Sequence, residues 1–362
     1  MIVPHVENMV GMDYPRDLYD VVVLADNCTD ETAELAQGAG AQVWVRRDPD
    51  RRGKGYALEW ALQRDLQNYD AVCVFDADNL ADTSFLSVMA LHLREGKQII
   101  QAYLDTKNPW DTWITASYAI AYWYMNRFWQ KARMRLGLSG ALGGTGFCVA
   151  TPVLQRLPWT SHSLTEDLEY TVRAVTEGLS VYWTPLTKVY DEKPVAFSST
   201  ITQRSRWLQG HWSVAFDHSP ALLRKLLSES SRGSRLKILD LLVYLWQPVV
   251  ILATGLDILV LELRVALGRG WYSHWLGAIM PHGIWLGLIA LGFGLPLIAV
   301  NLEDVDWRAV LYLPAFYLFN LSWIPIAWIG LLKRRDRAWH HTEHHRAISV
   351  VQRPAYRRRT SV

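Results

Sequence analysis

The sequence lacks any pattern of paired cysteines. Its three cysteines, Cys28, Cys73 and Cys148, are scattered over 362 residues without a CxxC spacing. An odd, dispersed set argues against a disulfide framework and indicates reduced thiols in a domain that faces the cytosol. The start of the chain also lacks a basic stretch followed by a long apolar run, so we expect no cleavable signal peptide.

The chain has no large excess of charge of either sign. Its 37 basic residues nearly cancel its 35 acidic ones, which argues against nucleic acid as a partner. Charge is instead missing from whole segments, because residues 241–256, 275–302 and 309–332 contain no Asp, Glu, Lys or Arg. Many of the 18 tryptophans lie near the ends of these segments, where amphipathic rings favour a bilayer interface.

These uncharged runs predict transmembrane helices over residues 237–332. A helix needs roughly 20 apolar residues to cross a bilayer core. The second and third runs reach that length, whereas the first does so only when extended to about 238–261, which includes Asp240 and Asp257. We therefore expect a lipid bilayer as partner and a multi-pass protein of the plasma membrane, with the domain before residue 200 in the cytosol.

The number of crossings stays open. Three crossings after a cytosolic domain place the C-terminus outside, yet the tail at 333–362 is basic and favours the cytosol. One apolar segment is then interfacial or re-entrant, and our candidate is the middle one, which Pro281, His282 and several glycines interrupt. The histidines at positions 340, 341, 344 and 345 fit a solvated run beside the membrane better than a metal site.

Residues 1–200 alternate short apolar runs with segments of helical spacing. The runs at 20–26, 41–46 and 70–78 predict strands, and 55–66 predicts a helix. This alternation predicts an α/β domain whose mainly parallel sheet carries helices on both faces. Ligands of such sheets bind beyond the carboxyl ends of the strands, where Asp26, Asp76 and Asp78 lie.

Two short motifs suit a phosphate-bearing ligand. Asp76 and Asp78 stand two residues apart just after a strand, an arrangement that suits a hard divalent cation with oxygen ligands. Lys54 lies between two glycines at a helix start, where backbone N–H groups and an ammonium meet phosphate or a nucleobase edge. Each motif taken singly also fits an ordinary solvated turn.

Two further motifs suit sugar chemistry beside a membrane. Glu166 and Asp167 follow Thr165 at an expected helix start, after the glycine-rich turn at 143–152. The sequence ITQRSRWLQGHW at 201–212 then combines Gln203, Arg206 and Trp207 just before the apolar runs. Taken alone, the first is a plain helix terminus and the second a basic interfacial helix that only anchors the chain.

The order DxD, TED, QxxRW resembles the inverting, membrane-bound family 2 glycosyltransferases, which include cellulose, chitin and hyaluronan synthases. The resemblance covers residues 20–210 in motif detail. It implies a GT-A-type domain at 1–200, interfacial helices at 201–236 and transmembrane helices at 237–332. It also implies transfer of a sugar from a nucleotide sugar, expected to be UDP-linked, to a growing polysaccharide or a lipid-linked acceptor.

The resemblance assigns the donor side to four residues. Asp26 is expected on the uracil or ribose side, with Lys54 nearby. Asp76 and Asp78 are expected to bind the diphosphate through Mg²⁺ or Mn²⁺. Such a cation stabilises the charge that develops on the departing pyrophosphate.

The resemblance assigns the residues of the remaining motifs to the acceptor side. Asp167 is expected to be the general base that deprotonates the acceptor hydroxyl, with Glu166 beside it. Gln203, Arg206 and Trp207 are expected to hold the acceptor sugar and the pyrophosphate. Direct displacement with one base and no carboxylate nucleophile inverts the anomeric centre.

The sequence departs from the family pattern at its start. Family members normally open this domain with a strand that ends in Pro-x-x-Asn or Pro-x-x-Glu, followed by a long helix. Residues 1–19 compress that unit and keep only Pro4, His5 and Glu7, so we predict a shortened first βα unit and assign no binding residue there. Either a segment has been deleted here or the chain start is assigned late.

Two alternatives follow from these motifs. The first is a single sugar transfer to a polyprenyl phosphate, which QxxRW disfavours because relatives that use a lipid phosphate usually lack it. The second is an inactive membrane scaffold or a subunit of an export complex, which the shortened start favours.

Overall fold

The computed structural model describes residues 2–64, 66–160, 163–266, 282–303 and 305–336. The histidines at 340–345 and most of the predicted basic tail lie outside the described residues. So does Pro281, whereas His282 and the glycines after it, which were also expected to interrupt the middle apolar run, lie in a helix.

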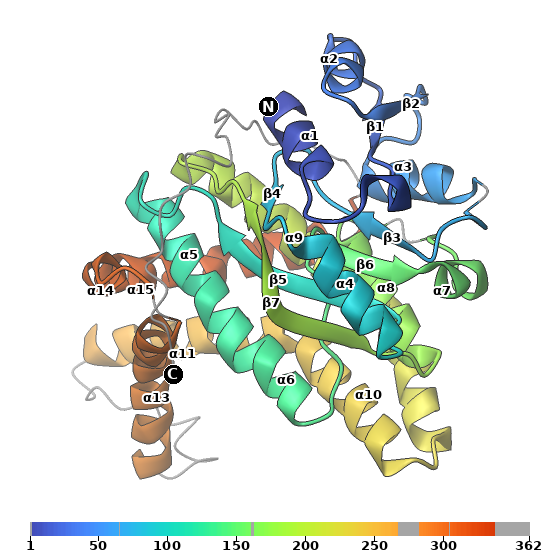
Figure 1. Cartoon of the computed structure of the whole chain (residues 1–362). Helices are drawn as coiled ribbons and strands as arrows, with labels where there is room; N and C mark the ends of the chain where they lie inside the picture. The colour runs from blue at the N-terminus through green and yellow to red at the C-terminus, as the bar shows by residue number, and fades with distance from the viewer. Residues whose placement is uncertain (1, 65, 161–162, 267–281, 304, 337–362) are drawn as a thin grey trace, which may run out of the picture.

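A five-stranded mixed sheet forms the centre of the molecule (Figure 1). Its strands, in spatial order, are β3 (Ala71–Val74), β6 (Phe147–Ala150), β5 (Ile99–Thr106), β7 (Val181–Asp191) and β4 (Leu80–Ala81). All eight residues of β5 are buried, which makes it the central strand. Two further strands, β1 (Val22–Asp26) and β2 (Gln42–Arg46), pair with each other in parallel as a separate small sheet.

The prediction of a mainly parallel sheet is wrong. In the central sheet only β5 and β7 pair in parallel, while the β3–β6, β5–β6 and β4–β7 pairs are antiparallel. The reason is β6, which starts at the glycine-rich turn and runs back between β3 and β5. Its four apolar residues follow that turn directly, and sequence reasoning assigned the whole segment to the turn.

The strands β3, β5 and β7 nevertheless run in one direction, so their carboxyl ends meet at one edge of the sheet. Asp76 and Asp78 follow β3, Lys107 follows β5, and Asp191 ends β7. The strand-end rule that the sequence suggested therefore holds at this edge, although the sheet is mixed.

Alternate side chains of the strands pack on opposite faces, as the two-residue period of a strand requires. On one face Ile100 and Ala102 pack with Phe85 and Met89 of α4 (Phe85–Arg94). On the other face Ile99 packs with residues of α7 (Thr151–Arg156) and α8 (Glu166–Thr176). These two clusters fix the frame that carries the site.

Residues 2–18 form helix α1 (Ile2–Val10) and the short η1 (Arg16–Leu18). The remnant of a strand-ending motif around Pro4 therefore lies in a helix. The buried side chain of Asn8 donates to the carbonyl of Ala81 at 3.1 Å and accepts from its N–H at 2.7 Å, which ties α1 to β4. Two more helices flank β1 and β2, namely α2 (Thr32–Gly38) and α3 (Lys54–Leu62).

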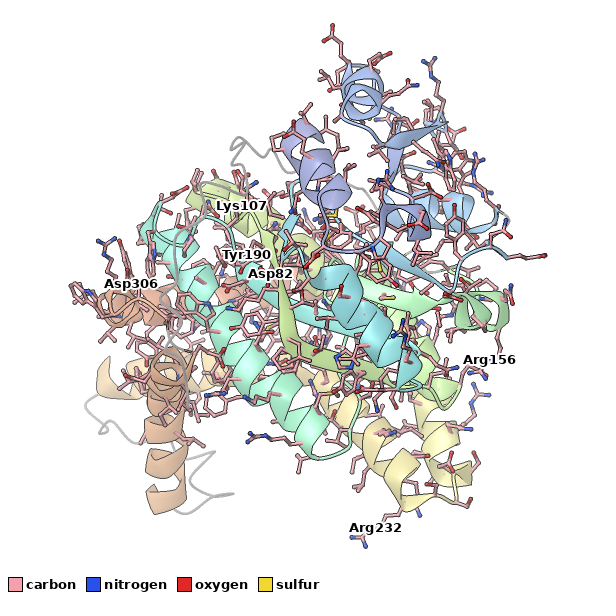
Figure 2. All side chains as sticks on the ribbon, in the orientation of Figure 1. Asp82, Lys107, Arg156, Tyr190, Arg232 and Asp306 are labelled. Atoms are coloured by element: carbon pink, nitrogen blue, oxygen red, sulfur yellow. The ribbon has the colours of Figure 1, made fainter. Side chains whose placement is uncertain are left out.

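The strand ends at the β4–β7 edge are joined by polar contacts. Figure 2 shows Asp82, Tyr190 and Lys107 gathered there. The hydroxyl of Tyr190 donates to Asp82 at 3.3 Å, and the ammonium of Lys107 donates to the carbonyl of Asp78 at 3.0 Å. The loop that carries the DxD motif is thus tied to the end of β5.

A helical layer completes the chain. One continuous helix, α5 (Trp113–Met125), η2 (Asn126–Gln130, a π-helical turn) and α6 (Lys131–Arg135), passes beside the sheet. The long α9 (Phe197–Ser228) crosses the domain boundary expected at residue 200 and carries QxxRW, and α10 (Arg232–Leu245) follows it. The remaining helices are α11 (Gln247–Ala266), α13 (His282–Leu302), α14 (Arg308–Leu311), α15 (Leu313–Leu321) and α16 (Trp323–Leu332).

Among the described residues, the stretch Leu313–Leu332 is long and apolar enough to cross a membrane. A second crossing is added if α10 and the first part of α11, which meet at a bend of 42°, act as one span. In the described part of the second run, Ala290–Leu302 is a shorter apolar helix. The described helices thus allow one crossing or two, fewer than the three apolar runs.

Candidate active site

A cavity of about 1230 Å³ lies beyond the carboxyl-end edge of the sheet and extends along α9. It brings together residues from four motifs that are far apart in the sequence. The predicted site residues that line it are Lys54, Asp76, Asp78, Glu166, Asp167, Gln203, Arg206 and Trp207.

Lys54 stands at the first position of α3, after Gly53 with its positive φ of 121°. Its ammonium donates to a carboxylate oxygen of Asp76 and to the carbonyl oxygen of Gly144. Burial alone would lower the pKa of Lys54, but the carboxylates of Asp76, Glu166 and Asp167 outweigh it and raise that pKa. The lysine is thus a charged group held among acids.

The DxD turn is fixed from several sides. The N–H of Asp76 donates to the hydroxyl of Thr145 at 3.0 Å, and the N–H of Asn79 donates to the carbonyl of Asp76 at 3.1 Å. The buried ring of His5 contacts the carbonyl of Asn79 through Nδ1 at 2.8 Å. Because its backbone is fixed in this way, the turn presents two carboxylates to the cavity without rearrangement.

Asp26 is placed differently from the other predicted residues. It ends β1, but its carboxylate pairs with Arg46 at 2.6 Å, and it is not among the described residues that line the cavity. Asn27, with a positive φ of 55°, donates to the same carboxylate at 3.0 Å. The structure therefore shows Asp26 as part of a strand-end network, and the expected nucleoside contact stays a prediction.

The carboxylates of Glu166 and Asp167 open helix α8 and are partly buried. Burial, together with the neighbouring charge of Asp167, raises the pKa of Glu166 to about 7. Burial also raises the pKa of Asp167, against the bond from the Leu168 N–H at 2.8 Å and the charge of Lys54. Gly144 has a φ of 82° and lies beside Asp167. A Cβ added at Gly144 would stand 3.4 Å from Oδ2 of Asp167, so the lack of a side chain lets the backbone approach this carboxylate.

Helix α9 presents QxxRW to the cavity. Gln203, Arg206 and Trp207 are spaced by three and four residues, so they lie on one face of the helix. The side-chain amide oxygen of Gln203 accepts a hydrogen bond from the hydroxyl of Tyr118 at 3.1 Å. The ring of Trp207 meets the Tyr118 ring edge-on, with 6.2 Å between the ring centroids. The Nε of Arg206 is buried, and within the part of the chain that the structure describes it has no hydrogen-bond partner.

Arg204, between these residues, has a structural role. It is fully buried, donates to the hydroxyl of Ser322 at 2.9 Å and lies 4.1 Å from the ring centre of Phe319. It therefore ties α9 to the apolar helices and turns Arg206 toward the cavity.

Sequence reasoning missed Asp191, which also lines the cavity. It pairs with the ammonium of Lys193 at 2.6 Å, and Lys193 in turn lies 3.3 Å from the ring centre of Tyr122. The second carboxylate oxygen of Asp191 is buried without a hydrogen-bond partner among the described residues. The rule that selected Asp76, an acid at the end of a buried strand, also applies to VYD at 189–191.

The acids at this edge fit a hard divalent cation. Burial raises the pKa of Asp191 to about 6, Lys193 opposes the shift, and the carboxylates of Asp78 and Asp76 add to it. These carboxylates, which are oxygen donors, suit a cation that takes its other ligands from water and phosphate. Within the described residues no group of three or more His, Cys, Asp or Glu side chains forms a complete ligand set.

The chain is similar to known glycosyltransferases. A family model described as "Glycosyltransferase like family 2" matches residues 2–210. A probable glycosyltransferase of Bacillus subtilis, YdaM, is 24% identical over 57% of this chain and 51% of its own length. A beta-monoglucosyldiacylglycerol synthase of Nostoc is 28% identical over 66% of this chain and 51% of its own length. The matched segment thus spans about half the length of these relatives.

Among solved structures, a mannosyltransferase of Pyrobaculum calidifontis in complex with GDP-Man and Mn²⁺ has a similar fold. The TM-score is 0.52 and the identity 17%, over 92% of this chain and 83% of that one. At this identity the likeness shows the fold alone. With the family match it confirms the predicted GT-A-like fold, here with a mixed sheet: the chain belongs to glycosyltransferase family 2.

Proposed function

We propose that this protein is a metal-dependent, inverting glycosyltransferase that moves a sugar from a nucleotide sugar, UDP-linked, to an acceptor hydroxyl at a membrane. The main support is the convergence of Lys54, Asp76, Asp167 and Arg206 on one cavity. These residues come from three strand or helix ends and from the face of α9, and a shared ligand explains why they meet.

The donor end of the cavity suits a diphosphate. Lys54 and Arg206 supply positive charge, and the buried Nε of Arg206 still requires an acceptor. A Mg²⁺ or Mn²⁺ ion held by Asp76 and Asp78 would, when bound, neutralise the charge of the diphosphate. The mannosyltransferase of similar fold was solved with Mn²⁺, which supports this class of cation.

The acceptor end suits deprotonation of a hydroxyl. Asp167 is our general base, because its pKa is raised and an ordinary aspartate is a weak base. The acceptor oxygen attacks the anomeric carbon as its proton passes to Asp167, and the bond to the diphosphate oxygen breaks. A single displacement of this kind inverts the configuration at that carbon.

Gln203 and Trp207 are proposed to position the acceptor, through a hydrogen bond and through ring contact with an apolar face. We propose a polysaccharide or a glycolipid as the class of acceptor, since the chain is similar to a glucosyldiacylglycerol synthase. An inactive scaffold is less well supported, because the acids and cations of every motif are present and face one cavity.

Asp167→Asn tests the proposal. Membranes carrying the wild-type chain are incubated with labelled UDP- and GDP-sugars, and we expect sugar transfer that stops on chelation of divalent cations and returns with Mn²⁺ or Mg²⁺. The variant should lose about 100-fold or more of the transfer rate, because the base is removed. UDP binding by the variant reports that it is folded, and unchanged sugar incorporation would reject Asp167 as the base.

A further inference from the structure

The cavity has a second part that the sugar-transfer motifs do not use. Beyond Trp207 it continues between α11, α13, α15 and α16. Figure 1 shows α11 and α13 at the lower left of the molecule, with α15 above them. We call this part the apolar arm. Residues that define it are Val250, Ile251, Gly292, Phe293, Leu321 and Ile324.

The two parts differ in chemistry. Charged groups such as Lys54, Asp76 and Arg206 line the first part, whereas none of the lining residues from α11, α13, α15 and α16 carries a charge. The lining from these helices is mainly aliphatic and aromatic, with Gln247, Thr254, Tyr317 and Asn320 as its polar members. Most sugar hydroxyls placed there lose water without gaining hydrogen bonds, which is unfavourable. A hydrocarbon chain in the same place gains from leaving water. The apolar arm therefore favours a lipid tail over a polysaccharide.

Size and opening agree with this assignment. The whole cavity, at about 1230 Å³, exceeds the roughly 300–1,000 Å³ of a pocket for one small ligand. Val250 and Leu318 line the arm and are also 64% and 67% exposed. The mouth of the arm is thus apolar on its outer side, and it lies on the same helices that could enter a bilayer. A ligand can reach it from the lipid.

We propose that the apolar arm binds the hydrocarbon tail of a lipid acceptor whose hydroxyl headgroup lies at Asp167. This inference rests on the proposed function and names its acceptor class. The acceptor hydroxyl forms the bond to the anomeric carbon, its proton goes to Asp167, and the electron pair of the broken bond leaves with the nucleoside diphosphate. A lipid phosphate fits this site less well, because it is already ionised and needs no base.

Gly292→Leu tests the arm. A Cβ at Gly292 would meet no atom within 4 Å, so the leucine fills open space of the arm without a packing clash. Gly294→Leu is the matched control, since its Cβ also meets nothing within 4 Å and Gly294 does not line the cavity. Both changes replace glycine in the same helix by a stronger helix former.

The assay compares dioctanoylglycerol, glycerol and a polyprenyl phosphate as acceptors in detergent micelles, with donor hydrolysis by water as the internal reference. We expect the wild type to prefer dioctanoylglycerol over both others. Gly292→Leu should lower the ratio of lipid transfer to donor hydrolysis about tenfold, the effect of occupying a few methylene positions in an apolar pocket. Gly294→Leu should keep the wild-type ratio, and nucleotide binding verifies that each variant is folded.

The outcomes separate the two proposals. Equal transfer to glycerol and dioctanoylglycerol, preference for polyprenyl phosphate, or a wild-type ratio in Gly292→Leu would overturn the lipid-tail assignment and leave the glycosyltransferase intact. Absence of both transfer and donor hydrolysis in the wild type, with every nucleotide sugar of the panel, would overturn the proposed function and this inference with it.

Discussion

At the scale of single residues, the site concentrates charge in a place that water screens poorly. Glu166 and Asp167 are adjacent, partly buried and opposed by Lys54, whose ammonium also contacts Asp76. Removing carboxylates from water disfavours their charged forms, and a nearby cation restores them in part. Burial and the neighbouring charge of Asp167 therefore disfavour the charged form of Glu166, and burial disfavours that of Asp167, while backbone hydrogen bonds and Lys54 favour the charged forms.

This balance predicts how transfer depends on pH. The base Asp167 must be deprotonated, so the rate at saturating substrate should rise as the pH passes through the raised pKa of Asp167 and then level off. Lys54 lowers the pKa of both acids, so Lys54→Met should move the rising limb to higher pH. A pH–rate profile measures the shift, and a limb that stays in place or moves to lower pH would contradict it.

At the scale of elements, α9 positions the site against the apolar helices. Gly210 faces Thr165 at the start of α8, where a Cβ would lie 2.7 Å from the Thr165 nitrogen. Gly330 of α16 faces Leu208 of α9, where a Cβ would lie 2.8 Å from the Leu208 Cβ. These two close contacts place α9 between the helix that carries the proposed base and the helices that form the apolar arm.

Gly210→Ala should therefore disturb both stability and transfer. The added methyl group overlaps a backbone atom, so the helices must separate, at a cost of about 1–3 kcal/mol in the free energy of unfolding. Displacement of α8 moves Glu166 and Asp167, which should lower the transfer rate. Thermal unfolding in detergent and the transfer assay measure the two effects.

Gly233→Ala in α10 is the control for this prediction. The nearest atom to its Cβ is the Ser231 hydroxyl at 3.9 Å, and alanine suits a helix better than glycine. It should match the wild type in activity and equal or exceed it in stability. If Gly210→Ala behaved like Gly233→Ala, the contact between α9 and α8 would not matter for the site.

At the scale of the whole molecule, the helices α11, α15 and α16 expose many large apolar side chains. Leu259, Leu318 and Leu332 are among the most exposed of them, at 65%, 67% and 77%. They lie on α11, α15 and α16, the helices that also enclose the apolar arm. Contiguous exposed apolar surface of this kind marks a site of contact with a membrane or another protein.

We therefore predict that the chain is an integral membrane protein. After cell lysis it should remain with the membrane fraction through washes with high salt and with alkaline carbonate, and detergent should release it. Apolar burial in the bilayer is insensitive to salt, whereas binding through charge alone is screened. Release by high salt would show that the association is electrostatic and that α15 and α16 do not enter the bilayer.

How well the sequence predicted the place of each site residue differs from motif to motif. Asp76, Asp167 and Arg206 could be selected from sequence because their motifs, each unspecific alone, occur together in the order of a known family, and Asp76 also follows the strand-end rule. Asp26 followed the same rule, yet in the structure its carboxylate pairs with Arg46. Asp191 also fitted the rule and was missed, because residues 181–191 were not identified as a strand.

What the sequence by itself determined is the class of chemistry, the family and the apolar character of the second half, since these depend on residue types and their order. Only the tertiary structure decided that the sheet is mixed, that Asp26 lies outside the cavity lining and Asp191 within it, and that the cavity continues into an uncharged arm. The physical reason is that strand direction, burial and cavity shape arise from contacts between segments far apart in the chain, which local patterns do not encode.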